Sequence, residues 1–184
     1  MLGFIVSIVS AVFLLVAILV FANRKPGYSH LRHTISELGE VGAPDQRLVG
    51  FGVFLPVGLM LLFVGYSFRL THELTTLLSV CIGAGYLGAA FFPCDPGSPL
   101  TGTMRQTIHN IGGAVEYFGG FVALMRISES WGVGFQIAGF IVGGTGFALS
   151  IPALAPVRGL IQRVAELCLF GGLILAIGLE YGVF

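Results

Sequence analysis

Long apolar runs separated by short polar segments are the main feature of the sequence. The runs are about 18 residues or longer, which is the length that an α-helix needs to cross a bilayer. They are continuous, with no alternation of period two, so they favour helices over the strands of a barrel. We therefore expect an all-α membrane protein, a bundle of six transmembrane helices that forms one domain over residues 1–184. The predicted spans cover about residues 3–22, 48–68, 74–92, 108–125, 132–151 and 164–184.

The composition supports this class and excludes others. Hydrophobic residues make up 55% of the chain and charged residues 10%, whereas a soluble domain carries about 25% charged residues. Nine basic residues balance nine acidic ones, which leaves no basic surplus for binding nucleic acid. The 28 glycines are typical of helices that pack closely within a membrane. We expect the lipid bilayer to be the main partner.

The distribution of Lys and Arg predicts how the helices are oriented. Most basic residues lie in the first, third and fifth loops between the predicted spans, and basic loops face the cytoplasm. We therefore expect both termini outside the cell. Arginines gathered to bind an anionic group would give the same distribution. The residues concerned are Arg24, Lys25, Arg32, Arg47, Arg105, Arg158 and Arg163.

The first loop is predicted to contain a short amphipathic helix. Ser29 is a plausible N-cap and Gly39 a plausible end. On such a helix His30, His33 and Glu37 fall at positions i, i+3 and i+7, along one stripe. These groups suit metal binding, proton transfer or ion pairing. The alternative is a surface helix whose polar side chains meet only water and lipid headgroups.

The third loop is predicted to be a rigid turn that contains Asp95. Three prolines and a glycine occur between Pro93 and Pro99, which excludes a helix there. Such a turn can hold a carboxylate in a fixed geometry for chemistry. It can equally be a turn whose aspartate caps its own backbone.

The fourth span carries a carboxylate inside its apolar run. His109, Gly113, Glu116 and Gly120 are spaced so that they share one helix face. A charge at the depth of Glu116 costs about 2.5–3.5 kcal/mol on insertion scales, so this residue must face the interior and find a partner, or stay protonated. We treat it as a candidate functional residue, with a structural ion pair as the alternative.

The start of the last span offers a further polar group. Arg163 and Glu166 are three residues apart, and they either cap the helix or form a site for an anion. Arg158 is expected to extend toward the membrane interface.

Three sequence elements together resemble a known family. The first loop contains Ile35-Ser36-Glu37-Leu38-Gly39, the third begins with Phe92-Pro93-Cys94-Asp95, and His109 opens the fourth span. This pattern resembles the integral-membrane family called domain of unknown function 998, over about residues 5–183. The resemblance implies six spans and a prokaryotic inner (cell) membrane. It implies no established activity.

Three functions remain open at this point. One is a protein that binds or transports an anionic lipid or small solute, as a monomer or homodimer, in which Glu116 and His109 form a proton-coupled gate. Its ligand-binding residues would be Arg32, Arg105, His109, Glu116 and Arg163. Another is a structural or sensory partner protein that uses the polar first loop for docking.

The remaining function is a metal-dependent enzyme that acts on a lipid or another amphiphile. Three histidines and a water are a catalytic zinc set, with a carboxylate as general base. The candidate zinc ligands are His30, His33 and His109. The candidate catalytic residues are Ser36, Glu37, Asp95 and Glu116. Each of these functions requires that polar groups from separate segments meet at one membrane face.

Overall fold

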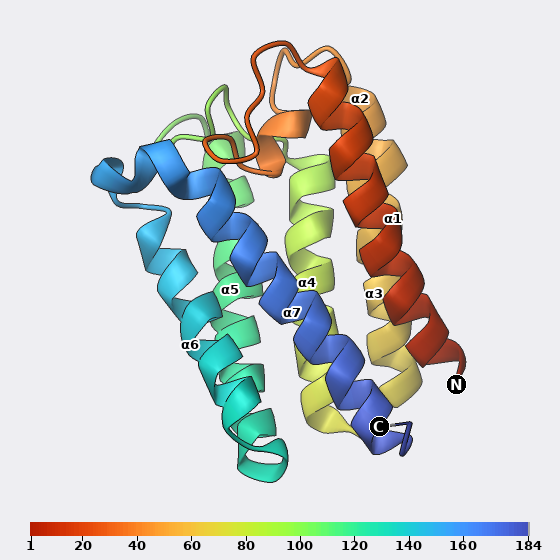
Figure 1. Ribbon diagram of the computed structural model, residues 1–184. Helices are drawn as coiled ribbons and strands as arrows, with labels where there is room; N and C mark the ends of the chain where they lie inside the picture. Colours follow the sequence, from red (N-terminus) through yellow and green to blue (C-terminus); the bar gives the residue numbers. More distant parts are fainter. Residues whose placement is uncertain (184) are drawn as a thin grey trace.

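The computed structural model describes residues 1–183, and this part of the chain is helical without strands. Long helices lie side by side in a bundle, with η3 projecting from it at one end (Figure 1). The elements in chain order are α1 (Leu2–Arg24), η1 (Ser36–Gly39), α2 (Gln46–Val49), η2 (Gly50–Phe54), α3 (Leu55–Phe68), α4 (Glu73–Phe91), α5 (Met104–Trp131), α6 (Val133–Ala148), η3 (Pro152–Val157) and α7 (Arg158–Glu180).

Several of these helices are long and apolar enough to cross a membrane, as the hydropathy pattern predicts. Four segments meet both criteria: Leu2–Arg24, Gln46–Phe68, Glu73–Phe91 and Pro152–Glu180. The second of them contains α2, the π-helix η2 and α3 in unbroken succession. The chain is therefore a multi-pass membrane protein. The end of the last predicted span, Phe184, lies outside the described residues.

The predicted amphipathic helix in the first loop is wrong. Gly27 adopts a φ of 73°, the chain continues in turns, and only Ser36–Gly39 forms a short 3-10 helix. The reason is that partners elsewhere in the chain bind the loop backbone. The Arg163 guanidinium donates to the carbonyl oxygens of His30 and His33 at 2.8 and 3.0 Å. These long-range bonds replace the i to i+4 bonds that a helix would make.

The bundle is tightly packed where glycines face each other across α3 and α4. A Cβ on Gly83 would lie 3.1 Å from the carbonyl oxygen of Gly58, so a larger residue would push the two backbones apart. Small residues at such crossings allow membrane helices to approach closely. The interior of the bundle is filled by large apolar side chains that are less than 2% exposed: Leu61, Leu78, Ile82, Leu124, Leu169, Leu173 and Ile177.

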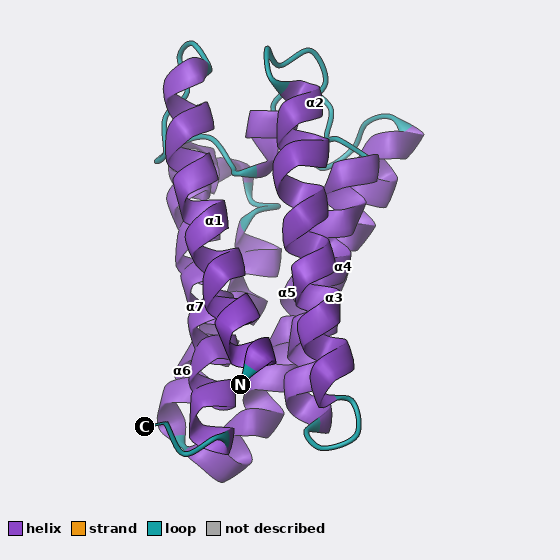
Figure 2. Ribbon diagram, turned by 90° about the vertical axis from the view of Figure 1, so that its right-hand side faces the viewer, coloured by secondary structure: helices purple, strands orange, loops and turns teal. Residues whose placement is uncertain are grey.

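The polar loops gather at one end of the bundle. The loop after α1 and the loop between α4 and α5 lie at this end, and both termini lie at the other (Figure 1). Figure 2 shows the same arrangement from the side, with loops above and below the helices. We call the end that carries the first loop the loop end. The fold thus brings segments that are far apart in sequence together at one face.

The close contact between α3 and α4 can be tested by substitution. We expect Gly83→Ala to lower the free energy of unfolding by about 1–3 kcal/mol, because the new methyl group meets a backbone oxygen that cannot move aside. The control is Gly144→Ala, whose Cβ would meet nothing within 4 Å and which should change stability by less than about 1 kcal/mol. Unfolding of the purified protein in detergent measures both. Equal stability of the two variants would contradict this packing.

Candidate functional site

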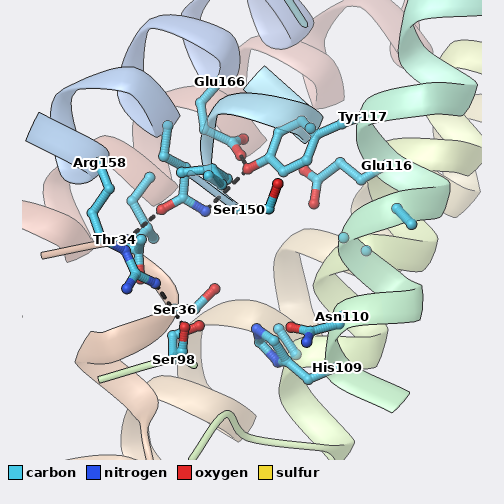
Figure 3. Close-up of a pocket in the computed structure, with 18 of the residues that line it drawn as sticks. Thr34, Ser36, Ser98, His109, Asn110, Glu116, Tyr117, Ser150, Arg158 and Glu166 are labelled. Carbon is cyan, nitrogen blue, oxygen red and sulfur yellow. Dashed lines mark hydrogen bonds between the residues drawn. The ribbon is translucent and has the colours of Figure 1, made fainter. Parts of the chain in front are cut away.

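A cavity of about 250 Å³ opens near the loop end of the bundle. Its walls come from the first loop, α4, the loop before α5, α5, the end of α6 and the start of α7. Figure 3 shows labelled polar side chains directed into it from several of these segments. The polar lining residues are Thr34, Ser36, Tyr86, Ser98, His109, Asn110, Glu116, Tyr117, Ser150, Arg158, Gln162 and Glu166.

Two carboxyl groups lie together at the inner end of this cavity. Glu116 comes from α5 and Glu166 from α7, and their side chains interact directly. Both residues are 7% exposed. Glu166 accepts hydrogen bonds from the hydroxyl groups of Tyr86 at 2.9 Å and Tyr117 at 3.1 Å. We call Glu116 and Glu166 the carboxyl pair.

One oxygen of the carboxyl pair lacks a partner. Glu116 Oε1 is buried and makes no hydrogen bond within the described structure. The α4 helix makes room for this side chain at Gly85, because a Cβ there would overlap Glu116 Oε2. A buried acceptor without a partner is costly. Glu116 lines the cavity, and so does Arg158, whose Nε likewise has no hydrogen-bond partner.

Gln162 connects the carboxyl pair to the first loop. Its Nε2 donates to the Tyr117 hydroxyl at 3.0 Å, and its Oε1 accepts from the Ile35 N–H at 2.6 Å. The residue is 8% exposed, so both bonds are shielded from water. One side chain of α7 therefore fixes the first loop relative to the inner end of the cavity.

Arg158 and His109 also line the cavity. Arg158 donates to the carbonyl oxygens of Gly97 and Ser98 at 3.0 and 2.8 Å, which fastens the loop before α5 to the start of α7. His109 Nδ1 lies 2.9 Å from the Phe92 carbonyl oxygen. Since that oxygen can only accept, Nδ1 carries the proton, and Nε2 of the neutral ring is an acceptor.

Asp95 organises the turn that precedes α5. Its carboxylate accepts from the Thr103 N–H at 2.8 Å, from the Thr103 hydroxyl at 2.9 Å and from Arg105 at 2.7 Å. The backbone bond from Thr103 and the Arg105 guanidinium hold the pKa of Asp95 below its ordinary value, despite some desolvation. In the same turn, burial raises the pKa of the Cys94 thiol to about 12. The turn is thus rigid, and its carboxylate is occupied.

Other candidates from the sequence are placed in structural roles. Arg163 donates to loop carbonyls and to the Tyr28 hydroxyl, so its predicted anion site is filled by the chain itself. Glu37 accepts from the N–H and the hydroxyl of Thr34. Arg105 is bound to Asp95 and the Pro93 carbonyl, and Arg32 is exposed.

The three histidines proposed as zinc ligands lie in three different environments. His109 lines the cavity. His33 accepts from the Ser29 N–H, and His30 is exposed, with a pKa lowered by partial desolvation and by Arg163. Over residues 1–183, no group of three or more His, Cys, Asp or Glu side chains is arranged to hold a metal ion. The geometry therefore does not form the expected zinc set.

The sequence prediction identified one half of the carboxyl pair and missed the other. Glu116 and His109 were placed correctly on one interior face of α5, and Ser36 also lines the cavity. For Glu166 the sequence predicts a helix cap or an anion site together with Arg163, and it assigns no role to Tyr86 or Gln162, which line the cavity. A signal was present, because Glu166 is followed by an apolar helix and must find an interior partner just as Glu116 must.

The role of Asp95 predicts a pH-dependent stability. Because its folded-state pKa is lowered, the stabilisation is present above the ordinary pKa of an aspartate, about 3.9, and is lost as the pH falls through the folded-state value. We expect Asp95→Asn to lower the melting temperature at neutral pH, with a difference from the parent that shrinks in acid. Thermal unfolding across this pH range measures it. Glu129→Gln, which removes an exposed pair with Arg126, is the control and should change little. A melting-temperature difference that persists undiminished in acid would contradict this role of Asp95.

Comparison with known proteins places the chain in a family. No curated protein and no solved structure shows significant similarity to it. A family model described as protein of unknown function (DUF998) matches residues 8–178, which is nearly the whole chain and includes the first loop, the Asp95 turn and the carboxyl pair. The chain therefore belongs to the DUF998 family.

Proposed function

We propose that this protein binds a small organic amine, as a cation, in the cavity at the loop end, with the carboxyl pair as its anionic partner. The observation that carries the proposal is the unpartnered, buried Oε1 of Glu116, a residue that lines the cavity. An ammonium group donates up to three hydrogen bonds and carries the charge that a carboxylate prefers. Such a ligand would satisfy the oxygen that the protein leaves open.

The distribution of charge favours a cation over the anionic ligand expected from the sequence. Among the lining residues, two carry carboxyl groups and one, Arg158, carries a guanidinium. Arg158 already donates to two loop carbonyls. Of the three arginines expected to bind an anion, Arg105 and Arg163 are bound to groups of the protein, and Arg32 is exposed and does not line the cavity. The Nε of Arg158 has no hydrogen-bond partner, but it lies 4.0 Å from the Glu37 carboxylate. Carboxyl groups therefore outnumber guanidinium groups in the lining, and the single guanidinium has a carboxylate beside it.

Aromatic rings near the carboxyl pair support the same ligand. Tyr86, Tyr117, Phe54 and Phe118 all line the cavity, and Phe54 packs against Tyr86 with ring centroids 5.8 Å apart. Ring faces attract cations, and most strongly where water is excluded. A carboxylate beside aromatic walls is a suitable environment for an ammonium group with an organic substituent.

A proton takes the place of the amine when the cavity is empty. Two adjacent carboxylates in an apolar region cannot both be charged without a large cost. The bound cation and the proton therefore compete for the same negative charge. Other titratable or charged groups near the pair are Tyr86 and Cys81 on α4, Tyr117 on α5 and Arg163 on α7.

The cavity that reaches the carboxyl pair lies in the half of the bundle nearer the loop end. Toward the other end, the interior is closed by fully buried apolar side chains, which include Ile82, Leu124 and Leu169. Binding from one side is therefore the activity that this conformation supports. Transport across the membrane in exchange for a proton is the extension of this proposal, and it requires that the apolar layer open.

We also propose that the chain crosses the membrane six times, with α5 and α6 as the additional spans. Both helices lie within the bundle beside the four apolar segments (Figures 1 and 2). Both termini lie at the same end (Figure 1), as an even number of crossings requires. The excess of Lys and Arg at the loop end supports a cytoplasmic loop end and external termini, in the prokaryotic inner membrane that the family resemblance implies.

The topology can be tested with single reporter positions. We expect a cysteine introduced by Thr71→Cys, between α3 and α4, to react with a membrane-impermeant maleimide added outside intact cells. A cysteine introduced by Ala43→Cys, in the first loop, should react only after the cells are opened. Natural cysteines are replaced beforehand, and this parent serves as the control. External labelling at both positions, or at neither, would contradict six crossings with this orientation.

The amine site can be tested with benzylammonium as the probe. We expect Glu116→Gln to weaken its binding to the purified protein by about tenfold or more, because a charged hydrogen bond is lost. Binding to the parent should weaken as the pH falls, by up to about tenfold per pH unit, because one bound cation releases one proton. Isothermal titration calorimetry in two buffers of different ionisation enthalpy measures affinity and proton release together.

The matched control for this test is Glu129→Gln, which removes an equally charged but exposed side chain and should leave benzylammonium binding unchanged. Glu116→Asp keeps the charge and should bind more tightly than Glu116→Gln. Affinity that is the same in the parent and in Glu116→Gln, with no pH dependence, would overturn the proposed function.

A further inference from the structure

The side of the cavity between α5 and α6 is open to the surroundings of the bundle. Ala114 and Phe118 of α5 and Ser150 after α6 line the cavity and are exposed. Gly113, Gly146 and Leu149 complete this edge and are half-buried. We call these six residues the side opening.

The side opening exists because α6 ends early. The two helices pack closely below it, where Phe118 and Phe147 form an edge-to-face contact with ring centroids 5.2 Å apart. Beyond that contact α6 ends at Ala148, while the antiparallel α5 extends from this level back to Met104. About thirteen residues of α5, or about 20 Å of helix, therefore have no neighbour from α6 beside them.

The segment that follows α6 does not close the gap. The η3 segment, Pro152–Val157, contains no buried residue and projects away from the bundle (Figure 1). Ile151 just before it is 47% exposed, and Leu160 just after it is 48% exposed. In a bilayer these apolar groups lie against lipid chains, so the side opening faces the membrane rather than water.

The direction toward water is more restricted. The loop before α5 extends over the cavity with Ser98, Pro99 and Leu100 among the lining residues. Arg158 fastens Gly97 and Ser98 from the α7 side, and Asp95 with Arg105 and Thr103 fixes the other end of the same loop. A ligand that enters from water must move this loop, whereas one that enters from the bilayer need not.

We propose that the ligand is an amphiphile, an amine that carries a long alkyl chain, and that it enters through the side opening. Its ammonium group lies at Glu116, while its chain leaves between α5 and α6 and lies against η3 in the bilayer. Small side chains at Gly113 and Gly146 provide the width for the chain. This inference rests on the proposed amine site, and it adds the substrate class and the path.

The test compares two amines in phosphatidylcholine proteoliposomes. Dodecylammonium has a chain that must pass the side opening, and benzylammonium has none. A Cβ on Gly113 meets nothing within 4 Å, so Gly113→Leu fits the fold and narrows the opening. We expect this variant to weaken dodecylammonium binding about tenfold more than it weakens benzylammonium binding. Gly144→Leu, exposed and outside the cavity lining, is the control and should bind both amines normally.

The outcomes separate the two proposals. If the parent binds neither amine, or if Glu116→Gln binds both as well as the parent, the amine site itself is wrong. If benzylammonium binding depends on Glu116 but Gly113→Leu weakens both amines equally, or weakens neither, the site stands and the lateral path is wrong.

A fluorescence measurement provides a second test that does not depend on affinity. The sequence has one tryptophan, Trp131, so the double substitution Trp131→Phe and Phe118→Trp leaves a single reporter at the side opening. We expect brominated phosphatidylcholine to quench this reporter, and dodecylammonium to reduce the quenching because its chain displaces lipid. Benzylammonium should have no such effect. Quenching by aqueous iodide in place of the brominated lipid would overturn the lateral path.

Discussion

The arrangement at the loop end depends on one constraint, which is that two glutamates lie inside a helical bundle built mainly of apolar side chains. Neither Glu116 nor Glu166 reaches bulk water, since each is 7% exposed, and an isolated charge at such a position is costly. The two carboxyl groups differ in their hydrogen bonds. Glu166 receives hydrogen bonds from Tyr86 and Tyr117, whereas Glu116 is left with an open oxygen. A purely structural pair would have no reason to keep that difference, because satisfying both carboxyls would give greater stability. The open oxygen is therefore the feature on which the proposed ligand site rests.

The same constraint explains why the first loop is irregular. Gln162 connects the Tyr117 hydroxyl to the Ile35 N–H, and Arg163 holds the carbonyls of His30 and His33. Both residues come from the α7 turns next to Glu166, so the loop is fastened to the helix that supplies half of the carboxyl pair. Gly159 allows this contact, since a Cβ there would overlap the loop backbone at His33. A regular helix would satisfy its own carbonyls and give α7 nothing to bind. The loop thus lacks the hydrogen bonds of a helix, and its bonds to α7 fix its position over the cavity.

Sequence reasoning predicts the features that are set by the free energy of transferring side chains from water to lipid. It fails where hydrogen bonds form between groups that are far apart in the sequence. The apolar runs located the long helices, and the cost of a charge in hydrocarbon placed Glu116 in the interior, next to His109 on the cavity side of α5. The same cost applies to Glu166, but its spacing from Arg163 predicts a helix cap or an anion site, whereas in the structure Glu166 accepts hydrogen bonds from Tyr86 and Tyr117. The arginines show the limit most clearly. Their number at the loop end suggested an anion site, yet a count of charges does not include the backbone carbonyls and Asp95, which bind most of their donors.

Because these arginines are hydrogen-bonded within the protein, the ligand that we propose carries a positive charge, whereas the sequence predicts an anion. A loop end that is rich in basic residues attracts anions only through guanidinium groups that remain available, and here Arg105, Arg158 and Arg163 hold the chain in place. What remains open in the partly aromatic cavity lining is an acceptor of Glu116 and the Nε of Arg158, and that nitrogen already lies 4.0 Å from the Glu37 carboxylate. The positive charge of the loops then has a different consequence for a cationic ligand, because it opposes approach from the aqueous side on which those loops lie. A cation dissolved at the bilayer surface that enters beside the shortened α6 avoids that barrier and meets the carboxyl pair directly. The electrostatics of the loop end and the geometry of the side opening therefore favour the same ligand, an amine that is already held in the membrane by its chain.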